Sequence, residues 1–253
     1  ALPHASIRDK IGHIELLEDG KGSSILFRLT ADIDADTQSH WQQWAQQQDV
    51  ELYWQNAQEK RAYVTQTAMR HYQLDGFSLN YHPQDFIQVN GAMNIKMVKQ
   101  AMDWLAPSFD DVILDLFCGV GNFSLPLAQR AKQVLGVEVQ ASMVEAAQAN
   151  AKNNHSDNLS FIAADLTQKP STDITQLGVT KVLLDPPRAG AYEFLPSLIK
   201  LKPKQILYVS CDAATLARDA EYLLENRYRV ERAGMMDMFP QTAHLETMLL
   251  FSL

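Results

Sequence analysis

The stretch DVILDLFCGVGNFSLPLAQR (residues 111–130) runs from an apolar strand core through a loop with two glycines into an amphipathic helix. Asp115 opens the loop, and Gly119 and Gly121 allow the backbone to bend tightly and to approach a ligand closely. In an open parallel sheet, ligands bind beyond the carboxyl ends of the strands. The stretch therefore predicts a strand–loop–helix unit with a binding site at its loop.

Apolar strand cores and amphipathic helices continue to alternate after this unit. Further strands are expected at 134–138, 159–165, 181–185 and 206–210, and helices at 92–105, 141–152, 191–200 and 213–224. Five such alternations predict a doubly wound, mostly parallel sheet. Residues 227–253 contain two strand-like pieces without a helix between them, which predicts a closing antiparallel hairpin.

The first 80 or so residues have a different pattern. A hairpin is expected within 11–35, a helix at 36–48, and short strands up to FIQVN at 86–90. We therefore predict two domains, a small α+β subdomain over 1–85 and an α/β domain over 86–253.

The composition is that of an ordinary soluble globular protein, with 46% apolar and 21% charged residues in a chain of 253. The sequence has no apolar run of about 18 residues and no signal peptide, and its two cysteines are too few for a disulfide framework. A cytoplasmic protein is expected, and the start without Met suggests a fragment. The net charge of −8 argues against simple electrostatic binding of nucleic acid.

Acidic residues follow the second and third expected strands of the α/β domain. Glu138 is placed to accept hydrogen bonds from ribose hydroxyls, and Asp165 from an adenine amino group. The run G-V-G-N-F-S lacks the third glycine of a dinucleotide site, and Asp115 would repel a phosphate. S-adenosylmethionine, which carries a sulfonium and an amino group, fits better. The alternative is a helix-capping glycine with surface acids.

Cys211 follows the fifth expected strand and comes just before a helix. The helix macrodipole should lower the pKa of its thiol and favour a nucleophilic role. The alternative is that the cysteine is a small, buried, apolar side chain that only packs, and this alternative suits Cys118 better than Cys211. Asp185-Pro186-Pro187-Arg188 lacks the aromatic residue expected for amino-group methylation, which weakens that interpretation.

A methyltransferase with a nucleophile suits a pyrimidine C5 atom, which attacks a methyl group only after a thiolate has added to C6. A base must then remove the C5 proton. Glu246 is the candidate base, and His244 is a rival or an orienting residue. A surface glutamate on a strand is the alternative.

DLFCGVGNFSLPLA, VLLDPPRAG, YVSCDAATLARD and DMFPQTAHLETMLLF resemble motifs of the bacterial RNA uracil-5 methyltransferases, most closely those of members acting on 23S ribosomal RNA. The likeness covers nearly the whole chain. It implies a class I S-adenosylmethionine-dependent methyltransferase fold, Rossmann-like with a mostly parallel seven-stranded sheet, after a small α+β subdomain. It also implies C5 methylation of a 23S ribosomal RNA uridine. Transfer RNA is the alternative substrate, and a non-catalytic binding module is the alternative class of protein.

The resemblance makes Cys211 the nucleophile and Glu246 the base. Around S-adenosylmethionine it places six further residues: Gln88, Phe117, Asn122, Glu138, Asp165 and Asp185. It implies no metal in this chain. Arg188 and Phe239 are candidates to hold a target base rotated out of the RNA.

The sequence departs from the family pattern in two ways. Asp212-Ala213 replaces the usual Asn-Pro, and an acid beside the thiol should raise its pKa. The iron–sulfur cluster and the RNA-binding TRAM domain of the ribosomal enzymes are expected only in a preceding region. Without that region, we expect the chain to bind S-adenosylmethionine but to methylate ribosomal RNA poorly on its own. We also expect a monomer.

Overall fold

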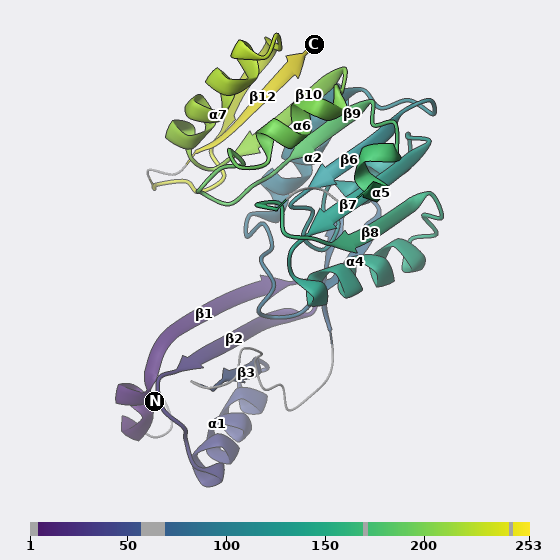
Figure 1. The fold of residues 1–253 in the computed structure, drawn as a ribbon. Helices are drawn as coiled ribbons and strands as arrows, with labels where there is room; N and C mark the ends of the chain where they lie inside the picture. Colours follow the sequence, from purple (N-terminus) through teal and green to yellow (C-terminus); the bar gives the residue numbers. More distant parts are fainter. Residues whose placement is uncertain (1–4, 57–68, 169–171, 243–244) are drawn as a thin grey trace. The chain divides into compact units, whose positions relative to one another are not determined.

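The structure is a computed structural model that describes residues 5–56, 69–168, 172–242 and 245–253. It divides into two compact units, which Figure 1 draws as a ribbon. The smaller unit comprises residues 1–72 and 80–86, and the larger comprises 73–79 and 87–253. The predicted division at residue 85 stays a prediction.

The smaller unit is built on a three-stranded sheet. It consists of the short 3-10 helix η1 (Ala5–Lys10), strands β1 (Ile11–Asp19) and β2 (Gly22–Leu29), helix α1 (Ala35–Gln47) and strand β3 (Glu51–Gln55). β1 and β2 form the predicted hairpin, and α1 carries the chain over to β3, which is parallel to β2. Asp34 caps α1 by accepting a hydrogen bond from the Thr37 N–H.

Aromatic side chains form the core of the smaller unit. The centre of the Phe27 ring lies 5.1 Å from the ring centre of Trp41 and 5.1 Å from the ring centre of Trp54. A buried ion pair adds to this core, because the Arg70 guanidinium is fully buried and contacts both carboxylate oxygens of Asp19, at 2.6 and 2.8 Å.

Strands β4 (Arg70–Leu74) and β5 (Phe77–Tyr81) form a separate two-stranded sheet. The strand expected at 86–90 is wrong. Phe86 and Val89 are exposed there, and the segment leads into helix α2 with Asn90 as its N-cap.

The larger unit contains the predicted seven-stranded sheet, in the order β11-β12-β10-β9-β6-β7-β8. Its strands are β6 (Val112–Leu116), β7 (Gln133–Glu138), β8 (Leu159–Ala163), β9 (Lys181–Leu184), β10 (Gln205–Ser210), β11 (Arg229–Met236) and β12 (Glu246–Ser252). β12 is antiparallel to both of its neighbours, and the five strands from β10 to β8 run parallel. The closing hairpin is confirmed, with its last strand inserted into the sheet.

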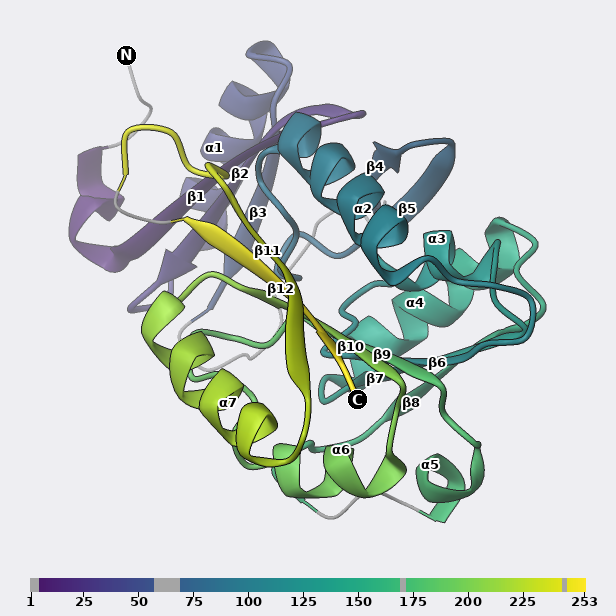
Figure 2. The ribbon, with the colours of Figure 1, turned by 90° about the horizontal axis from the view of Figure 1, so that it is seen from above.

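In the part of the larger unit that the structure describes, six helices cover the two faces of this sheet. They are α2 (Gly91–Leu105), α3 (Ser124–Ala128), α4 (Ala141–Asn153), α5 (Thr172–Gln176), α6 (Leu195–Leu201) and α7 (Ala213–Glu225). Figure 2 shows α2, α3 and α4 on one face and α5, α6 and α7 on the other. The helix expected from residue 191 begins only at Leu195, because residues 191–194 form turns and Pro196 suits a first helical turn.

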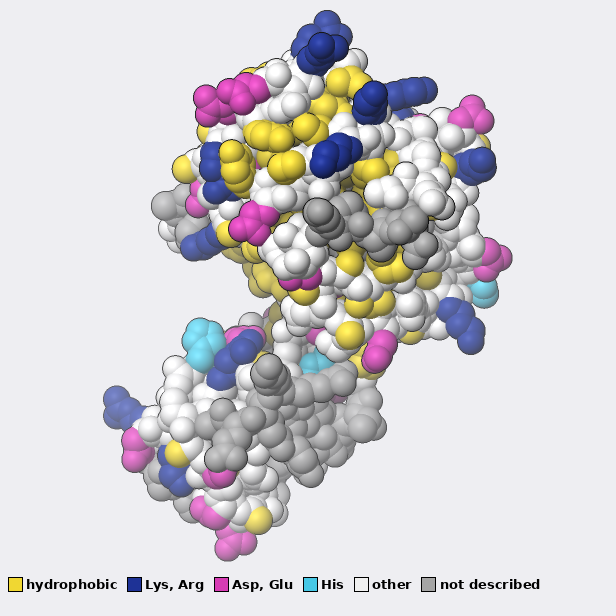
Figure 3. All heavy atoms as spheres, viewed as in Figure 1, with side chains coloured by type: hydrophobic (Ala, Val, Ile, Leu, Met, Phe, Trp, Pro, Cys, Tyr) yellow, Lys and Arg dark blue, Asp and Glu magenta, His cyan; other side chains and the backbone are white. Residues whose placement is uncertain are grey.

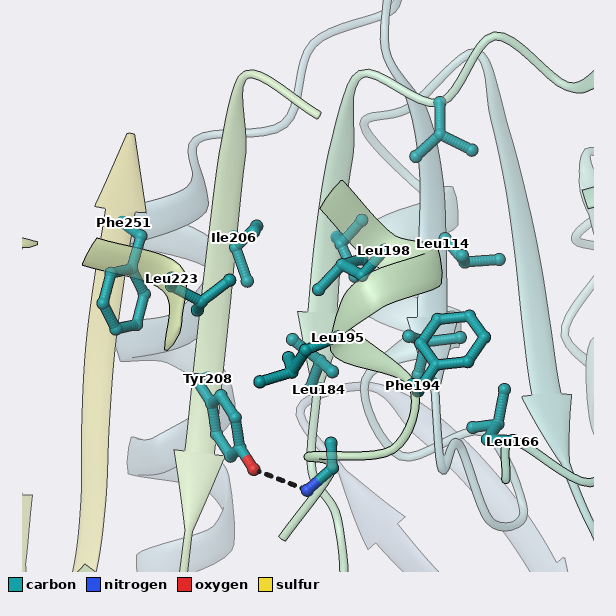
Figure 4. Close-up of a cluster of buried hydrophobic side chains, with 14 of the residues drawn as sticks. Leu114, Leu166, Leu184, Phe194, Leu195, Leu198, Ile206, Tyr208, Leu223 and Phe251 are labelled. Atoms are coloured by element: carbon teal, nitrogen blue, oxygen red, sulfur yellow. Dashed lines mark hydrogen bonds between the residues drawn. The ribbon is translucent and has the colours of Figure 1, made fainter. Parts of the chain in front are cut away.

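The continuous apolar runs of the parallel strands account for their burial on both faces. On the α5–α7 face, Leu184 and Ile206 from the sheet pack with Leu195 and Leu198 of α6 and Leu223 of α7 (Figure 4). Among the described residues, no helix has the length and apolar character needed to cross a membrane.

Candidate active site

The carboxyl rim of the parallel strands collects most of the predicted site residues. Strand β12 is antiparallel to these strands, so its first residue, Glu246, lies at this rim. In the order of the sheet, the rim carries Glu246, Cys211, Asp185, Asp115, Glu138 and Asp165.

The loop after β6 has the tight backbone that its glycines predict. Phe117, Gly119 and Gly121 have φ values of +61°, +55° and +98°. For Phe117 this left-handed backbone is strained, which is typical of residues at functional sites. The buried Asn150 amide of α4 donates to the Val120 carbonyl at 3.0 Å and so fixes the loop to α4.

Glu138 is buried at the end of β7, beside the same loop. Its Oε1 accepts hydrogen bonds from the N–H groups of Val139 and Gln140, at 2.8 and 3.0 Å. Its Oε2 accepts a longer one, of 3.3 Å, from the Gly119 N–H. These contacts fix the carboxylate where the sequence predicts a ribose contact.

Asp115 is completely buried in β6. Its Oδ2 accepts a hydrogen bond from the Ser124 hydroxyl, while Oδ1 has no hydrogen-bond partner among the described residues. Burial and the nearby Glu138 charge, against the opposing hydrogen bond from Ser124, together raise the pKa of Asp115 to about 7. An unpartnered acidic oxygen of this kind suits a cationic or hydrogen-bond-donating ligand.

Asn122 is held by a residue that the sequence analysis missed. Its side-chain amide exchanges two hydrogen bonds, of 2.8 and 2.9 Å, with the amide of Asn94 on α2. Asn94 is buried on the same face of α2 as Met97, Val98 and Ala101. A polar residue on an otherwise apolar helix face was the available signal for this role.

Gln88 and Asp165 differ in their surroundings. The Gln88 Oε1 atom is buried without a hydrogen-bond partner among the described residues, as expected of a group that awaits a ligand donor. Asn90 brings this segment to the end of β11 by donating to the Met238 carbonyl at 3.3 Å. Asp165 is exposed, and its Oδ1 accepts hydrogen bonds from the N–H and hydroxyl of Thr167, at 2.9 and 2.7 Å.

Cys211 lies between β10 and α7 and is partly buried as a free thiol. The expectation that the helix lowers its pKa is wrong. Burial raises the pKa of Cys211, and the nearby charges of Glu246 and Asp185 add to the increase. The Asp212 carboxylate caps α7 by accepting from the N–H groups of Ala214 and Thr215, at 3.0 and 3.1 Å.

Glu246 lies beside Cys211 by the register of the sheet. Ser210 of β10 pairs with Thr247 of β12. Because the two strands are antiparallel, Cys211, which follows Ser210, and Glu246, which precedes Thr247, meet at the rim. Burial raises the pKa of Glu246, which is only 4% exposed. Burial, Glu246 and Asp115 also raise the pKa of Asp185 well above its ordinary value.

Arg188 is exposed in the loop after β9. Its positive charge opposes part of the increase in the pKa of Cys211 and contributes to the lowered pKa of Asp212. Phe239 is partly buried in the turn that follows β11, and its carbonyl accepts from the Thr242 N–H at 3.1 Å. His244 lies outside the described residues. On the face shown in Figure 3, Lys and Arg side chains and Asp and Glu side chains are scattered among other residues.

Cys118 is buried in the glycine loop, as its alternative role predicts. A Cβ atom at Gly136 on β7 would lie 2.9 Å from its sulfur and 2.3 Å from the Phe161 ring. Burial raises the pKa of Cys118 well above the ordinary value, so this thiol packs rather than reacts.

The sheet order is that of the class I S-adenosylmethionine-dependent methyltransferases. The family model described as tRNA (Uracil-5-)-methyltransferase matches residues 8–253. The chain belongs to this family, which confirms the resemblance of its motifs.

Two relatives illustrate the similarity in sequence. The 23S rRNA (uracil(1939)-C(5))-methyltransferase RlmD of Marinomonas sp. (strain MWYL1) is 62% identical over 240 residues, which cover 95% of this chain and 54% of that protein. The protein of the same name from Aeromonas salmonicida (strain A449) is 46% identical over 247 residues, covering 96% and 55%. The chain thus spans little more than half the length of these relatives.

Solved structures agree. The Pyrococcus abyssi tRNA (uracil-54, C5)-methyltransferase in complex with S-adenosyl-L-homocysteine has a TM-score of 0.74 and 26% identity, covering 94% of this chain and 59% of that one. Methanocaldococcus jannaschii TYW2 in complex with AdoMet (S-adenosylmethionine) has a TM-score of 0.60, covering 94% and 99%, and at 14% identity it supports the fold alone.

Proposed function

We propose that this chain is the catalytic part of an RNA (uracil-5-)-methyltransferase that methylates C5 of a uridine in 23S ribosomal RNA. The observation that carries the proposal is the meeting of Cys211 and Glu246 at the carboxyl rim, across the Ser210–Thr247 pair. The names of the sequence relatives favour 23S ribosomal RNA over transfer RNA as the substrate.

S-adenosylmethionine, when bound, supplies an electrophilic methyl group next to C5. The residues proposed to hold it fit its chemistry, because it offers an amino group, ribose hydroxyls and a positive charge. Glu138 provides a fixed carboxylate for the hydroxyls, and Asp115 and Gln88 provide unpartnered buried oxygens. Phe117, Asn122, Asp165 and Asp185 complete the proposed set.

Cys211 begins the reaction on the uracil. Its thiolate adds to C6, and the electron pair of the C5–C6 double bond moves towards O4, which makes C5 nucleophilic. Because the pKa of the thiol is raised, the thiol needs a base nearby as it attacks. The Asp185 carboxylate, whose charge acts on the thiol, is the proposed acceptor of this proton, and it returns the proton when the thiolate is released; the Glu246 carboxylate stays free for the last step.

Glu246 ends the reaction. After C5 has gained the methyl group, the Glu246 carboxylate removes the remaining C5 proton. The released electron pair restores the C5–C6 double bond and expels the Cys211 thiolate. The raised pKa of Glu246 makes it a stronger base than an exposed glutamate. Arg188 and Phe239 are proposed to hold the rotated uracil.

Trapping with 5-fluorouridine tests this mechanism, because fluorine at C5 cannot be removed as a proton. The chain is incubated with S-adenosylmethionine and fluorinated fragments of 23S ribosomal RNA or transfer RNA, and adducts are detected by denaturing gel and mass spectrometry. A covalent adduct on Cys211 with the ribosomal fragment is expected. An adduct with transfer RNA alone would change the substrate.

Two cysteine variants provide the control. Cys211→Ser should abolish the adduct, whereas Cys118→Ala should retain it because Cys118 is buried in packing contacts. Adduct formation by Cys211→Ser would refute the proposed nucleophile. No adduct with either RNA, despite binding of both, would favour a non-catalytic binding module.

Three expectations from the sequence stay predictions. They are that the protein is a monomer, that it is cytoplasmic, and that an iron–sulfur cluster lies outside this chain.

A further inference from the structure

The loop that follows β9 is fixed by a buried carboxylate on α7. This loop, residues 185–191, begins with Asp185 and carries Arg188. Asp219 is completely buried, and its Oδ2 accepts hydrogen bonds from the Ala191 N–H at 2.7 Å and from the Tyr208 hydroxyl at 2.6 Å. The Ala191 N–H also donates to the Tyr208 oxygen at 3.0 Å, drawn as a dashed line in Figure 4.

Arg218 completes the arrangement from the neighbouring position of α7. Its Nε and Nη2 atoms donate to the second oxygen of Asp219, at 2.8 and 2.7 Å, and Nη2 also donates to the Ala189 carbonyl at 2.9 Å. Its guanidinium carbon lies 5.0 Å from the centre of the Tyr192 ring. We call Asp219, Tyr208 and Arg218 the Asp219 cluster.

Gly190 shows how closely the loop packs on this cluster. A Cβ atom there would lie 2.6 Å from Arg218 Nη2 and 2.7 Å from Asp219 Oδ2, and the φ of Gly190 is +79°. The backbone at residues 189–191 is therefore held on three successive residues, by hydrogen bonds to Ala189 and Ala191 and by close packing at Gly190.

The Asp219 cluster belongs to the same strand and helix that position the candidate nucleophile. Tyr208 is on β10, Asp219 is on α7, and Cys211 lies between these elements. At the other end, the charges of Asp185 and Arg188 act on the Cys211 thiol. The cluster thus joins the loop to the element that holds the thiol.

We propose that Asp219, Tyr208 and Arg218 are positioning residues that hold the 185–191 loop so that Arg188 faces Cys211. Asp185 is anchored separately, because its N–H donates to the Leu116 carbonyl of β6 at 3.3 Å. The inference rests on the proposed function, since only a reacting Cys211 requires such a loop position. A fully buried carboxylate needs several donors to be stable, and among the described residues the side-chain and backbone donors to Asp219 come from the loop, from β10 and from α7 itself. The packed apolar core next to it holds these elements together without it.

Arg218→Met is the main test, because the side chain of Arg218 is 44% exposed and Asp219 keeps its hydrogen bonds from Ala191 and Tyr208. Tyr208→Phe, which removes only a hydroxyl, is the second variant. The matched control is Arg229→Met, which changes an arginine that is 76% exposed on β11. Circular dichroism checks that each variant is folded.

Three measurements follow. Hydrogen exchange of the Ala191 amide should become at least about tenfold faster in both variants. The apparent pKa for alkylation of Cys211, followed by peptide mass spectrometry, should rise by about half a unit or more as Arg188 moves away while Glu246 and Asp185 remain. Formation of the 5-fluorouridine adduct should slow by about tenfold or more, with affinity for S-adenosylhomocysteine unchanged.

Each outcome decides the inference. Unchanged exchange at Ala191 would show that the cluster does not hold the loop. Faster exchange with an unchanged alkylation profile and adduct rate would show a purely structural role. If the unsubstituted chain forms no adduct, the proposed function fails separately. Hydrogen exchange at Ala191 and alkylation of Cys211 still test whether the Asp219 cluster holds the loop, because neither measurement needs RNA.

Discussion

The buried carboxylate of the smaller unit and the buried carboxylates at the rim of the larger unit have opposite surroundings. In the smaller unit, the Asp19 side chain is 2% exposed and forms an ion pair of 2.6 Å with Arg70. In the larger unit, Asp115 and Glu246 are also buried, yet among the described residues neither forms an ion pair with Lys or Arg. A buried charge without a partner is costly, so such groups are typical of functional sites.

The pKa values follow this difference. Burial alone would raise the pKa of Asp19, but hydrogen bonds from Arg70 and Tyr81 hold it below its ordinary value. Burial raises the pKa of Asp115 to about 7 and also raises that of Glu246. The ion pair of the smaller unit is thus stable at neutral pH, whereas the rim holds carboxyl groups suited to exchanging protons.

The largest effect is expected at Glu246. Glu246→Gln should slow product release by about 10²–10⁴-fold, because no carboxylate remains to remove the C5 proton. The methylated RNA should stay attached to Cys211, and tritium release from C5-labelled uridine should stop. Glu221→Gln, at an exposed site on α7, is the control. Normal tritium release from Glu246→Gln would indicate another base, such as His244.

Breaking the ion pair of the smaller unit should affect stability rather than chemistry. Arg70→Met should lower the unfolding free energy of the smaller unit by about 3–5 kcal/mol, because Asp19 is left buried and unpaired. Arg28→Met removes a partly exposed pair with Glu15 and should cost about 0–1 kcal/mol. Urea unfolding followed by tryptophan fluorescence measures both. Similar losses would show that burial of the pair is unimportant.

The two units should also respond oppositely to pH. Asp115 binds its proton more tightly when folded, so its contribution to stability should fall as the pH rises from about 4 to 7, by a few kcal/mol at most. Asp19 behaves in reverse, and its contribution is lost as the pH falls below 3.8 through its lowered pKa. Unfolding of the chain and of Asp115→Asn at several pH values measures this. An equally steep pH dependence in Asp115→Asn would contradict the assignment.

The smallest effect is expected from the helix caps. Asp212→Ala removes the cap of α7 and should lower the rate of adduct formation by less than about tenfold, because Cys211 precedes this helix. Asp34→Ala removes the matching cap of α1 in the smaller unit and should leave that rate unchanged. Equal effects of the two variants on the rate would show that the cap of α7 has no special relation to the thiol.

Much of the larger unit was predictable because each parallel strand is an almost continuous apolar run bounded by a loop. The residue after each strand could then be assigned to one rim, which is where Asp185 and Cys211 lie. The strand expected at 86–90 was wrong because Phe86 and Val89 are apolar but exposed. Apolar character alone does not reveal that a segment has no neighbouring strand.

Features that depend on distant contacts could not be predicted. The pKa of Cys211 was expected to fall because the helix start is local, whereas burial and the Glu246 charge come from the folded sheet. The amide pair of Asn94 and Asn122 joins residues 28 positions apart. The catalytic and cofactor-binding roles of the rim residues stay predictions.

The insertion of β12 between β10 and β11 affects how the protein matures during synthesis. A nascent chain that has already formed β10 and α7 presents Cys211, but Glu246 joins it only when residues 246–252 leave the ribosome and pair with both neighbours. Until then the rim holds a thiol without its partner acid. Assembly of the proposed pair therefore requires β12 to have entered the sheet between β10 and β11.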